Sequence, residues 1–512
     1  MRTQSIQFLV RSLALTALFA SGAFAQSASD TVKCEVPAWE TKVKAAPGDL
    51  TLVVELGKAY LCAGRFRDAQ YTLEDAVALD FKSFEAHFFL ARSLFDQGDP
   101  DAALFEYGQL AGLYPERMEP QYQMGVVYSR LRKADDAIKS FTTAIDLGKK
   151  AEAPVNVMID AYSGLISQQR AKGDTAGAAK SYEDALALKP GDSSLALGRA
   201  QMLFESGKPN EALPQAYELV RQNAANAQAV LLIADIYEKQ GLADRAIREI
   251  DRALEVVKSG RDRSNLLTRR GLILQKLGRK ADAISAFTAA TNTYPEAWEA
   301  QYNLGVLKLN SQPSEALAHF RSAARLRPED GEIQLNIAAT QMLLKNYSAG
   351  YTAAKTAIQL LSSPASKSKA RLLAGQAAYL SGQYQDAAQE LKQLATSEPA
   401  NYQNQLWYGL TLLALKDSTS AIIALENATK LDAAATEART NLGAAYIAAK
   451  RYTDAERVSR EVVTIEPNNA DALANLGIAL ANLGKRDEAR ETLRKAAGLG
   501  STAAKRALEA LK

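Results

Sequence analysis

The chain has 512 residues, of which 61 are Lys or Arg and 58 are Asp or Glu, and its formal net charge is +3. A nearly neutral chain does not favour binding to nucleic acid or to an anionic membrane, because both require a strongly basic face. Length alone would suggest three or four domains, but the internal repeats described below predict one array that grows along a single axis.

Residues 1–25 have the features of a secretory signal peptide. Arg2 and Arg11 give a basic start, an apolar stretch follows over residues 13–19, and residues 23–25 are Ala-Phe-Ala. This pattern predicts export and cleavage after Ala25. A membrane anchor is the alternative, but the apolar stretch is too short to span a bilayer and no later stretch of about 18 apolar residues follows. We therefore expect a periplasmic or secreted protein with no transmembrane segment after cleavage.

Residues 26–49 are predicted to cap the N-terminal end, with one helix over residues 37–44, and to hold one half of a disulfide. The only two cysteines are Cys34 and Cys62. If that helix lies antiparallel to the next one across Gly48, residues at the same level have numbers that sum to about 96, as these two do. Since export leads to an oxidising compartment, we expect them to be joined. A redox-active pair is the alternative, but a Cys-x-x-Cys motif is missing.

Small residues recur at intervals close to 34 residues, which indicates a repeat architecture. They are Ala69, Ala103, Ala137, Ala178, Ala212, Ala246, Ala283, Ala316, Gly350, Ala387, Ala421, Ala455 and Ala489. Another small residue stands twelve positions before most of them, as at Gly57 and Gly125. Small residues let two antiparallel helices approach closely, while neighbouring Leu, Tyr and Phe side chains fill the remaining space.

Glycines and prolines divide each repeat into two helices. Glycines such as Gly64 and Gly98 stand between the helices, where a left-handed residue ends the first one. Prolines such as Pro115 and Pro190 recur where a repeat closes, because proline cannot continue a helix. Each repeat is therefore predicted to be a helical hairpin.

This pattern resembles the tetratricopeptide repeat, for example in Asn441-Leu442-Gly443 and Asn475-Leu476-Gly477. The resemblance covers most of the chain and implies an all-α fold, an α–α superhelix of about thirteen hairpins over residues 50–500, with the first helices lining a concave face. The implied repeats start near residues 50, 84, 118, 159, 193, 227, 264, 298, 331, 368, 402, 436 and 470. The fourth departs most from the pattern, since Ile166 stands at its small position and an extra turn or loop is expected over residues 147–154.

Three shifts in the repeat period mark candidate flex points, at residues 147–154, 257–263 and 361–369. Each is either a lengthened loop within one continuous array, which we favour, or a hinge; the third is the most linker-like in composition. Residues 501–512 are predicted to form a capping helix with Ala504, Leu508 and Leu511 facing inward.

The sequence offers no candidate catalytic, cofactor-binding or metal-binding residues. The two histidines, His87 and His319, fall in different repeats and are expected to be packing or surface residues. Metalloprotease, nucleophile-elbow and phosphate-loop motifs are missing as well. We therefore expect a protein that is not an enzyme.

The resemblance implies that the second, fifth, sixth and ninth positions of each first helix face the groove. Asparagine stands at the sixth position in two adjacent pairs of repeats, at Asn303, Asn336, Asn441 and Asn475, and Tyr302 precedes the first of them. Side-chain amides both donate and accept hydrogen bonds, so spaced asparagines can hold an extended peptide backbone. The alternative is that Asn-Leu-Gly is simply common at this place in the repeat.

A second candidate contact surface is aromatic. Phe88 and Tyr122 fall at the fifth position, which would expose them as anchors for a partner. Lys58 and Arg92 stand at the ninth position, but Val126 replaces a polar residue in the third repeat. A clamp for a C-terminal carboxylate, as in some chaperone-binding relatives, is therefore not indicated.

The function favoured by these features is a non-enzymatic scaffold outside the cytoplasm that holds protein or peptide partners in the groove, for envelope assembly or transport. A self-associating structural component of the cell envelope is the first alternative, and a polysaccharide-binding module is the second. Repeat geometry is shared by binders of unrelated targets, so the partner is not identified.

Overall fold

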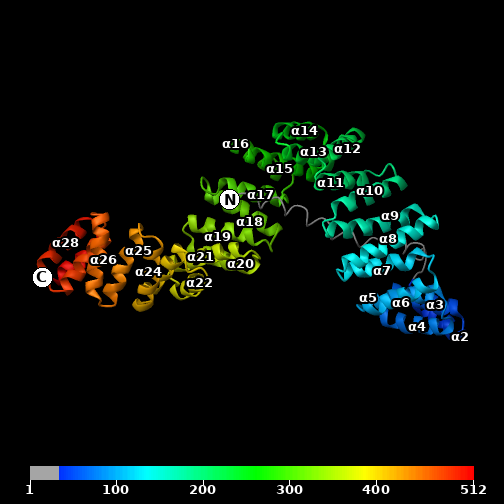
Figure 1. The fold of residues 1–512 in the computed structure, drawn as a ribbon, viewed down its shortest axis with the longest axis horizontal. Helices are drawn as coiled ribbons and strands as arrows, with labels where there is room; N and C mark the ends of the chain where they lie inside the picture. The colour runs from blue at the N-terminus through cyan, green and yellow to red at the C-terminus, as the bar shows by residue number, and fades with distance from the viewer. Residues whose placement is uncertain (1–33, 512) are drawn as a thin grey trace. The chain divides into compact units, whose positions relative to one another are not determined.

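The computed structural model describes residues 34–511, which form 28 α-helices, α2 to α29 (Figure 1). The predicted signal peptide of residues 1–25 lies outside the described residues. The chain divides into two compact units, Met1–Lys258 and Ser259–Lys512.

The first unit contains α2 to α14. Their bounds are α2 Val36–Ala45, α3 Leu50–Cys62, α4 Phe66–Leu79, α5 Phe84–Gln97, α6 Pro100–Leu113, α7 Met118–Arg130, α8 Ala134–Lys150, α9 Val155–Ala171, α10 Thr175–Leu188, α11 Ser193–Glu205, α12 Pro209–Gln222, α13 Ala227–Lys239 and α14 Ala243–Val256.

The second unit contains α15 to α29. Their bounds are α15 Gly260–Lys276, α16 Lys280–Thr293, α17 Trp298–Lys308, α18 Pro313–Leu326, α19 Gly331–Leu343, α20 Tyr347–Leu360, α21 Pro364–Leu380, α22 Tyr384–Ser397, α23 Tyr402–Ala414, α24 Ser418–Leu431, α25 Thr436–Ala448, α26 Tyr452–Ile465, α27 Ala470–Asn482, α28 Arg486–Gly498 and α29 Thr502–Ala510.

From α3 to α28 the helices pair into thirteen hairpins, each made of an odd-numbered first helix and an even-numbered second helix. The predicted all-α fold of helical-hairpin repeats is confirmed. The core lies between the two helices of each hairpin, where Phe141, Phe287 and Phe320 are fully buried. A Cβ added at Gly125 would lie 2.8 Å from the ring of Phe141, so a small residue is required for the two helices to pack this closely.

The turn within most hairpins contains one residue with left-handed backbone. Glycine takes this conformation in eight hairpins, as at Gly98 with a φ of 91°. Lys345, Lys416 and Lys450 stand at the equivalent place in three other repeats, with φ values of 59°, 64° and 59°. These lysines carry the strain of a left-handed residue with a side chain, and their positive charge lies near the negative end of the preceding helix dipole.

Tyrosines near the ends of some first helices join neighbouring hairpins. The Tyr446 hydroxyl donates to Glu426 on the preceding second helix at 2.6 Å, and the Arg451 guanidinium lies 4.6 Å from the centre of the Tyr446 ring. The same arrangement recurs at the N-terminal end, where Tyr60 donates to Glu40 of α2 at 2.7 Å. Helix α2 therefore occupies the place of a second helix without a first helix of its own.

The three shifts in the repeat period are accommodated mainly by extra turns of helix. This corrects the expectation of lengthened loops at residues 257–263 and 361–369, whereas an extra turn was one of the two expectations at residues 147–154. Helices α9, α15 and α21 each have 17 residues and begin about one turn earlier than the repeat pattern implied. The most linker-like segment, residues 361–369, is helical from Pro364, because the Ser363 side chain accepts a hydrogen bond from the Ser366 N–H and caps the helix. The first shift also lengthens α8, which continues to Lys150.

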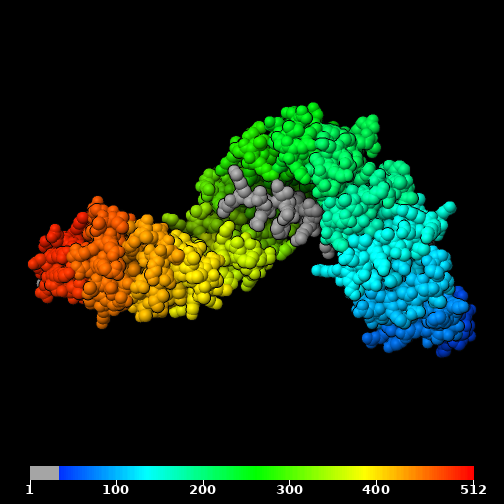
Figure 2. All heavy atoms as spheres, viewed as in Figure 1, coloured from blue at the N-terminus to red at the C-terminus, as the bar shows by residue number. Residues whose placement is uncertain are grey.

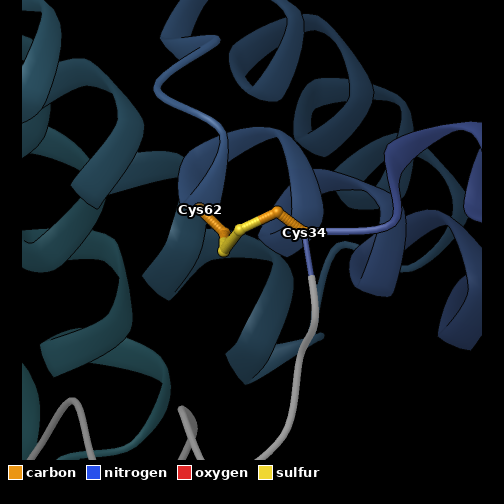
Figure 3. The surroundings of a disulfide bond; sticks show 2 residues. All are labelled: Cys34 and Cys62. Atoms are coloured by element: carbon orange, nitrogen blue, oxygen red, sulfur yellow. A yellow bond between two sulfur atoms is a disulfide. The ribbon is translucent and has the colours of Figure 1, made fainter.

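A disulfide joins Cys34, just before α2, to Cys62, the last residue of α3 (Figure 3). Their Cα atoms are 5.7 Å apart, which is the usual separation for bridged cysteines. The disulfide therefore fixes α2 against the first hairpin.

Helix α29 covers the opposite end of the array. Ala504 is fully buried, and Leu508 and Leu511 pack against the core formed with α27 and α28. Lys505, Arg506 and Glu509 are exposed. Its amphipathic pattern is therefore that of a capping helix, as expected from residues 501–512.

Candidate functional site: the first-helix face

The first helices of neighbouring hairpins contact one another. In the first unit α3 contacts α5, α7 contacts α9 and α11 contacts α13; in the second unit contacts link α19, α21, α23, α25 and α27 in series. The second helices have no comparable contacts with one another among residues 34–511. The surface formed by the odd-numbered helices, here called the first-helix face, is therefore the closely spaced side of each unit.

All four predicted asparagines lie on the first-helix face of the second unit, and three have the same orientation. In each of these three the side-chain N–H group donates to the carbonyl of the residue four positions earlier, at 2.8–2.9 Å: Asn303 to Glu299, Asn336 to Glu332 and Asn441 to Glu437. These bonds hold each side chain along its own helix. In these three the side-chain carbonyl oxygen is the remaining acceptor for a partner's backbone N–H.

The other groove residues of the second unit lie close to this series. The Asn336 side chain also donates to the Tyr302 hydroxyl at 3.1 Å, which brings together two predicted residues from neighbouring repeats. Asn475 instead donates to the Thr440 carbonyl of the preceding repeat at 2.9 Å, so it ties α27 to α25. The Tyr302 ring packs edge-on against Phe320, with the ring centres 5.8 Å apart. Tyr302 therefore contributes to the core as well as to the first-helix face.

Phe88 and Tyr122 do not form the exposed aromatic surface that was predicted in the first unit. Phe88 is 9 % exposed and Tyr122 is 4 % exposed. Phe88 contacts the rings of Phe84, Phe89 and Tyr107, while Tyr122 packs against Phe141. Because six successive residues of α5, 86–91, are buried, the helix has a wider buried face than the repeat positions implied.

The basic residues predicted beside that surface are paired within the chain. Lys58 contacts Glu55 at 2.8 Å and Glu85 at 2.9 Å, and Arg92 lies 3.7 Å from Asp96. Burial tends to lower the pKa of Lys58, but its two carboxylate partners outweigh that effect and raise it overall. These pairs reduce the attraction of this surface for an anionic partner.

Trp407 is a residue of this face that the sequence analysis missed. It stands at the sixth position of its repeat, in register with the asparagines, and is half-buried. Its indole N–H donates to Gln403 at 3.2 Å, and its ring meets Tyr379 edge-on with the centres 5.6 Å apart. The repeat register could have identified it, had aromatic as well as amide side chains been sought at that position.

Acidic side chains lie at the second position of the same first helices, at Glu299, Glu332, Glu437 and Asp471. Burial raises the pKa of Glu299, and the charge of Arg269 partly offsets this. Glu332 accepts a hydrogen bond from Ser366 of α21 at 2.6 Å. The first-helix face of the second unit therefore combines carboxylates, amide oxygens and one indole.

The two histidines have opposite environments in different hairpins. His87 is buried, with Nδ1 2.6 Å from Glu106 and Nε2 3.0 Å from the Phe81 carbonyl, and the hydrogen bond with Glu106 raises its pKa. His319 is half-buried beside Gln301, with 2.8 Å between Nδ1 and Oε1, and burial lowers its pKa. Both therefore serve the packing of their own hairpins.

Residues 34–511 contain no group of three or more His, Cys, Asp or Glu residues placed to hold a metal ion. None of their helices is long and apolar enough to cross a membrane.

Several known proteins are similar to parts of this chain. BBSome complex member BBS4 of Bos taurus is 25% identical over 273 residues, covering 53% of this chain and 50% of that protein. Protein O-mannosyl-transferase TMTC1 of Homo sapiens is 25% identical over 224 residues, covering 43% of this chain and 24% of that protein. The chain thus spans half or less of the length of these relatives. The crystal structure of the APC/C hetero-tetramer Cut9-Hcn1 aligns with a TM-score of 0.37 at 14% identity, covering 90% of this chain and 96% of that chain.

Two family models match segments along most of the described chain. One tetratricopeptide-repeat model matches residues 54–117, 165–223, 268–310, 372–429 and 409–465. A second tetratricopeptide-repeat model matches residues 203–268 and 446–511. Together with the thirteen helical hairpins, these matches over more than half of the sequence show that the chain belongs to the tetratricopeptide repeat family.

Proposed function

We propose that this tetratricopeptide-repeat scaffold is a non-catalytic protein, exported from the cytoplasm, that holds an extended segment of a partner protein on the first-helix face of its second unit. We propose that it acts as part of an envelope complex, in envelope assembly or in transport. The observation that carries the proposal is the series Asn303, Asn336 and Asn441, whose side chains share one orientation at one register.

This series suits an extended backbone. Each amide N–H group is already bonded to its own helix, so rotation of the side chain would break a hydrogen bond. The free carbonyl oxygens are thereby fixed in place, and a peptide backbone offers N–H groups at regular intervals. Recognition through backbone groups does not depend on side-chain sequence, which suits a scaffold that accepts several related segments.

Export is supported by features at the N-terminal end. The sequence of residues 1–25 has the pattern of a signal peptide. The only two cysteines of the chain are paired, and structural disulfides are rare in proteins that remain in the cytoplasm.

The test is cross-linking and affinity capture of the full chain from its own cells, with partners identified by mass spectrometry. The test variant carries Asn303→Ala, Asn336→Ala, Asn441→Ala and Asn475→Ala. The matched control replaces four exposed amide side chains on second helices of the same unit: Asn292→Ala, Gln359→Ala, Gln389→Ala and Gln393→Ala. Both variants remove four amides from the second unit, but on different helix faces. The unfolding midpoint of each variant is also measured, because the four asparagines make hydrogen bonds within the protein.

We expect the amount of partner captured by the test variant to fall at least about tenfold, since each lost hydrogen bond contributes on the order of 1 kcal/mol. The control should capture as much partner as the wild type. Equal capture by both variants would remove the asparagine series from the binding site. Recovery of this chain alone would instead support self-association, and capture of glycans without protein would support polysaccharide binding.

The described ends of the array do not favour end-to-end self-association. Helix α2 exposes Glu40, Lys42 and Lys44, and α29 exposes Lys505 and Arg506. Terminal repeats with a polar outer surface are the usual caps of a repeat array. A sedimentation coefficient that is independent of concentration would exclude this alternative.

A further inference from the structure

The first two hairpins, α3 to α6, have an unusual outer surface on their second helices. They form the N-terminal end of the first unit, drawn in blue in Figures 1 and 2. Four aromatic side chains are exposed among residues 34–511, and three of them are in these two hairpins: Tyr71 at 60 %, Phe81 at 59 % and Phe105 at 63 %. The core therefore does not account for these three rings.

Tyr71 and Phe105 occupy the same register, two residues after the recurring alanine of α4 and α6. This position is exposed in every repeat, and in most later repeats it is polar, as in Lys139, Lys180, Arg248, Ser285, Thr352, Gln389, Arg457 and Glu491. In two successive repeats this position is aromatic, although it is mostly polar elsewhere. Exposed apolar side chains that cluster in this way indicate an interaction surface.

Acidic residues lie beside both rings. Glu74 and Asp75 follow Tyr71 by three and four positions on α4, and Asp101 precedes Phe105 by four positions on α6, so each lies on the same helix face as the ring. Arg67, one turn before Tyr71, is the one basic residue of that face of α4. Between Leu50 and Leu113 the chain has ten acidic and five basic side chains.

The basic side chains of these hairpins do little to neutralise this surface, because three of the five are engaged elsewhere. Lys58 pairs with Glu55 and Glu85, Arg65 with Asp68, and Arg92 with Asp96. The outer faces of α4 and α6 therefore retain a negative potential around the two rings.

Helix α6 also has two glycines on the side of Phe105, of which Gly112 is exposed and Gly108 is half-buried. A Cβ added at Gly108 or Gly112 would meet nothing within 4 Å, so packing within the protein does not require glycine at either position. Glycine inside a helix costs about 0.5–1 kcal/mol relative to alanine, so neither residue is favoured by the stability of α6. Without side chains there, another helix can approach the α6 backbone closely.

We propose that Tyr71, Glu74, Asp75, Asp101 and Phe105, here called the acidic-aromatic patch, bind a basic amphipathic helix of a partner protein. The acidic side chains complement its Lys or Arg residues, the two rings take its apolar side chains, and Gly108 and Gly112 make room for its backbone. A second copy bound through the same patch would place the two acidic surfaces against each other, so the charge disfavours that occupant. The site is on second helices and is separate from the face proposed above.

The test uses the full chain and a fluorescent 18-residue helical probe peptide made of Leu and Lys at helical spacing. Binding is measured by fluorescence anisotropy at two salt concentrations, with a Leu and Glu peptide of the same pattern as the charge control. The test variant is Tyr71→Ser with Phe105→Ser. The matched control is Ile423→Ser, because Ile423 is 60 % exposed at the same register in the second unit.

We expect the double variant to bind the Lys probe at least about tenfold more weakly than both the wild type and Ile423→Ser. Glu74→Gln with Asp75→Asn and Asp101→Asn should weaken binding and reduce its salt dependence. Gly108→Ala with Gly112→Ala should weaken binding while raising the unfolding midpoint, which separates a docking role from a folding defect. Equal binding by the double variant and Ile423→Ser, or equal binding of the Lys and Glu probes, would overturn the proposal. So would concentration-dependent dimerisation that Tyr71→Ser with Phe105→Ser abolishes.

Discussion

At the scale of single residues, some turns between the two helices of a hairpin contain a strained backbone conformation. Lys345, Lys416 and Lys450 have left-handed backbone at a place where other repeats use glycine. A side chain in this conformation costs roughly 1–2 kcal/mol, and glycine avoids that cost but loses more backbone entropy on folding.

Replacing Lys450 by glycine should therefore stabilise its hairpin by about 0.5–1 kcal/mol. The free energy of unfolding is measured by urea titration with circular dichroism. The control is Lys430→Gly, which removes an exposed lysine from the last turn of α24 and should destabilise the protein, because glycine is unfavourable within a helix. Destabilisation by both changes would show that the turn is not strained.

The two histidines should change stability with pH in opposite directions. The raised pKa of His87 means that its contribution is fully present below about pH 6.5, the ordinary histidine pKa, and is lost as the pH rises through the folded-state pKa. The lowered pKa of His319 means that its contribution is present above about pH 6.5 and is lost as the pH falls through the folded-state pKa.

The measurement is an NMR titration of the two imidazole C–H signals, which His87→Gln and His319→Gln assign. The His87 signal should titrate at a higher pH than the His319 signal. In the His87→Gln variant, the unfolding free energy should fall less between pH 6 and pH 8 than it does in the wild type. A His87 signal that titrates below that of His319 would contradict both assignments.

At the scale of elements, the repeat period predicted the hairpins because each one repeats the same packing problem. A small residue on one helix faces a large one on the other, as Gly125 faces Phe141. The helix starts were less accurate: the alignment of small residues did not reveal the extra turns of α15 and α21, although Ser259 and Ser363 are capping residues that the sequence contains.

Prediction of the candidate site was more limited. The position of the asparagines followed from the repeat register, but their hydrogen bonds to carbonyls four residues earlier depend on the side-chain conformation. Phe88 and Tyr122 were placed wrongly, because the buried width of α5 and α7 depends on how neighbouring hairpins pack. Sequence position alone cannot distinguish a groove residue from a core residue at the fifth position.

The disulfide should stabilise one element rather than the whole array. Replacing both Cys34 and Cys62 by serine removes a constraint between residues 28 apart, which is worth at most about 3.6 kcal/mol in the chain-entropy model. Amide hydrogen exchange should become faster in α2 and at the end of α3, because α2 then depends on its remaining contacts with α3, such as that of Glu40 with Tyr60.

The second unit provides the internal reference for this experiment. Its exchange rates should not change, since each hairpin of a repeat array depends mainly on its neighbours. Faster exchange throughout residues 259–511 would show that the two cysteines act on more than the N-terminal cap.

At the scale of the whole molecule, helix contacts are local along the sequence. The substantial contacts among residues 34–511 link helices that are adjacent in the chain or one helix apart. Such an array leaves large surfaces for partners, and the two surfaces proposed here are on different units and different helix faces. Under the two proposals, one chain would bind two partners, one on each unit.

The export proposal is also tested on the whole molecule. Protein recovered from the native cells should begin at Gln26 and should lack the 25 residues before it, as measured by intact mass and N-terminal sequencing. Ala23→Leu with Ala25→Leu should block the cleavage, because the processing enzyme requires small residues at these two positions. Recovery of uncleaved wild-type protein from the cytoplasm would contradict the proposal.

The half hairpin at the N-terminal end has a consequence for how the gene can change. Because α2 presents Glu40 to Tyr60 as a second helix presents Glu426 to Tyr446, the first complete hairpin meets the same kind of neighbour as an internal one. A duplication of one 34-residue unit would therefore place the new hairpin between surfaces that it already fits. Duplication or deletion of repeats in the gene could therefore lengthen or shorten the array in steps of one hairpin. The disulfide-bonded α2 and the capping helix α29 would remain unchanged.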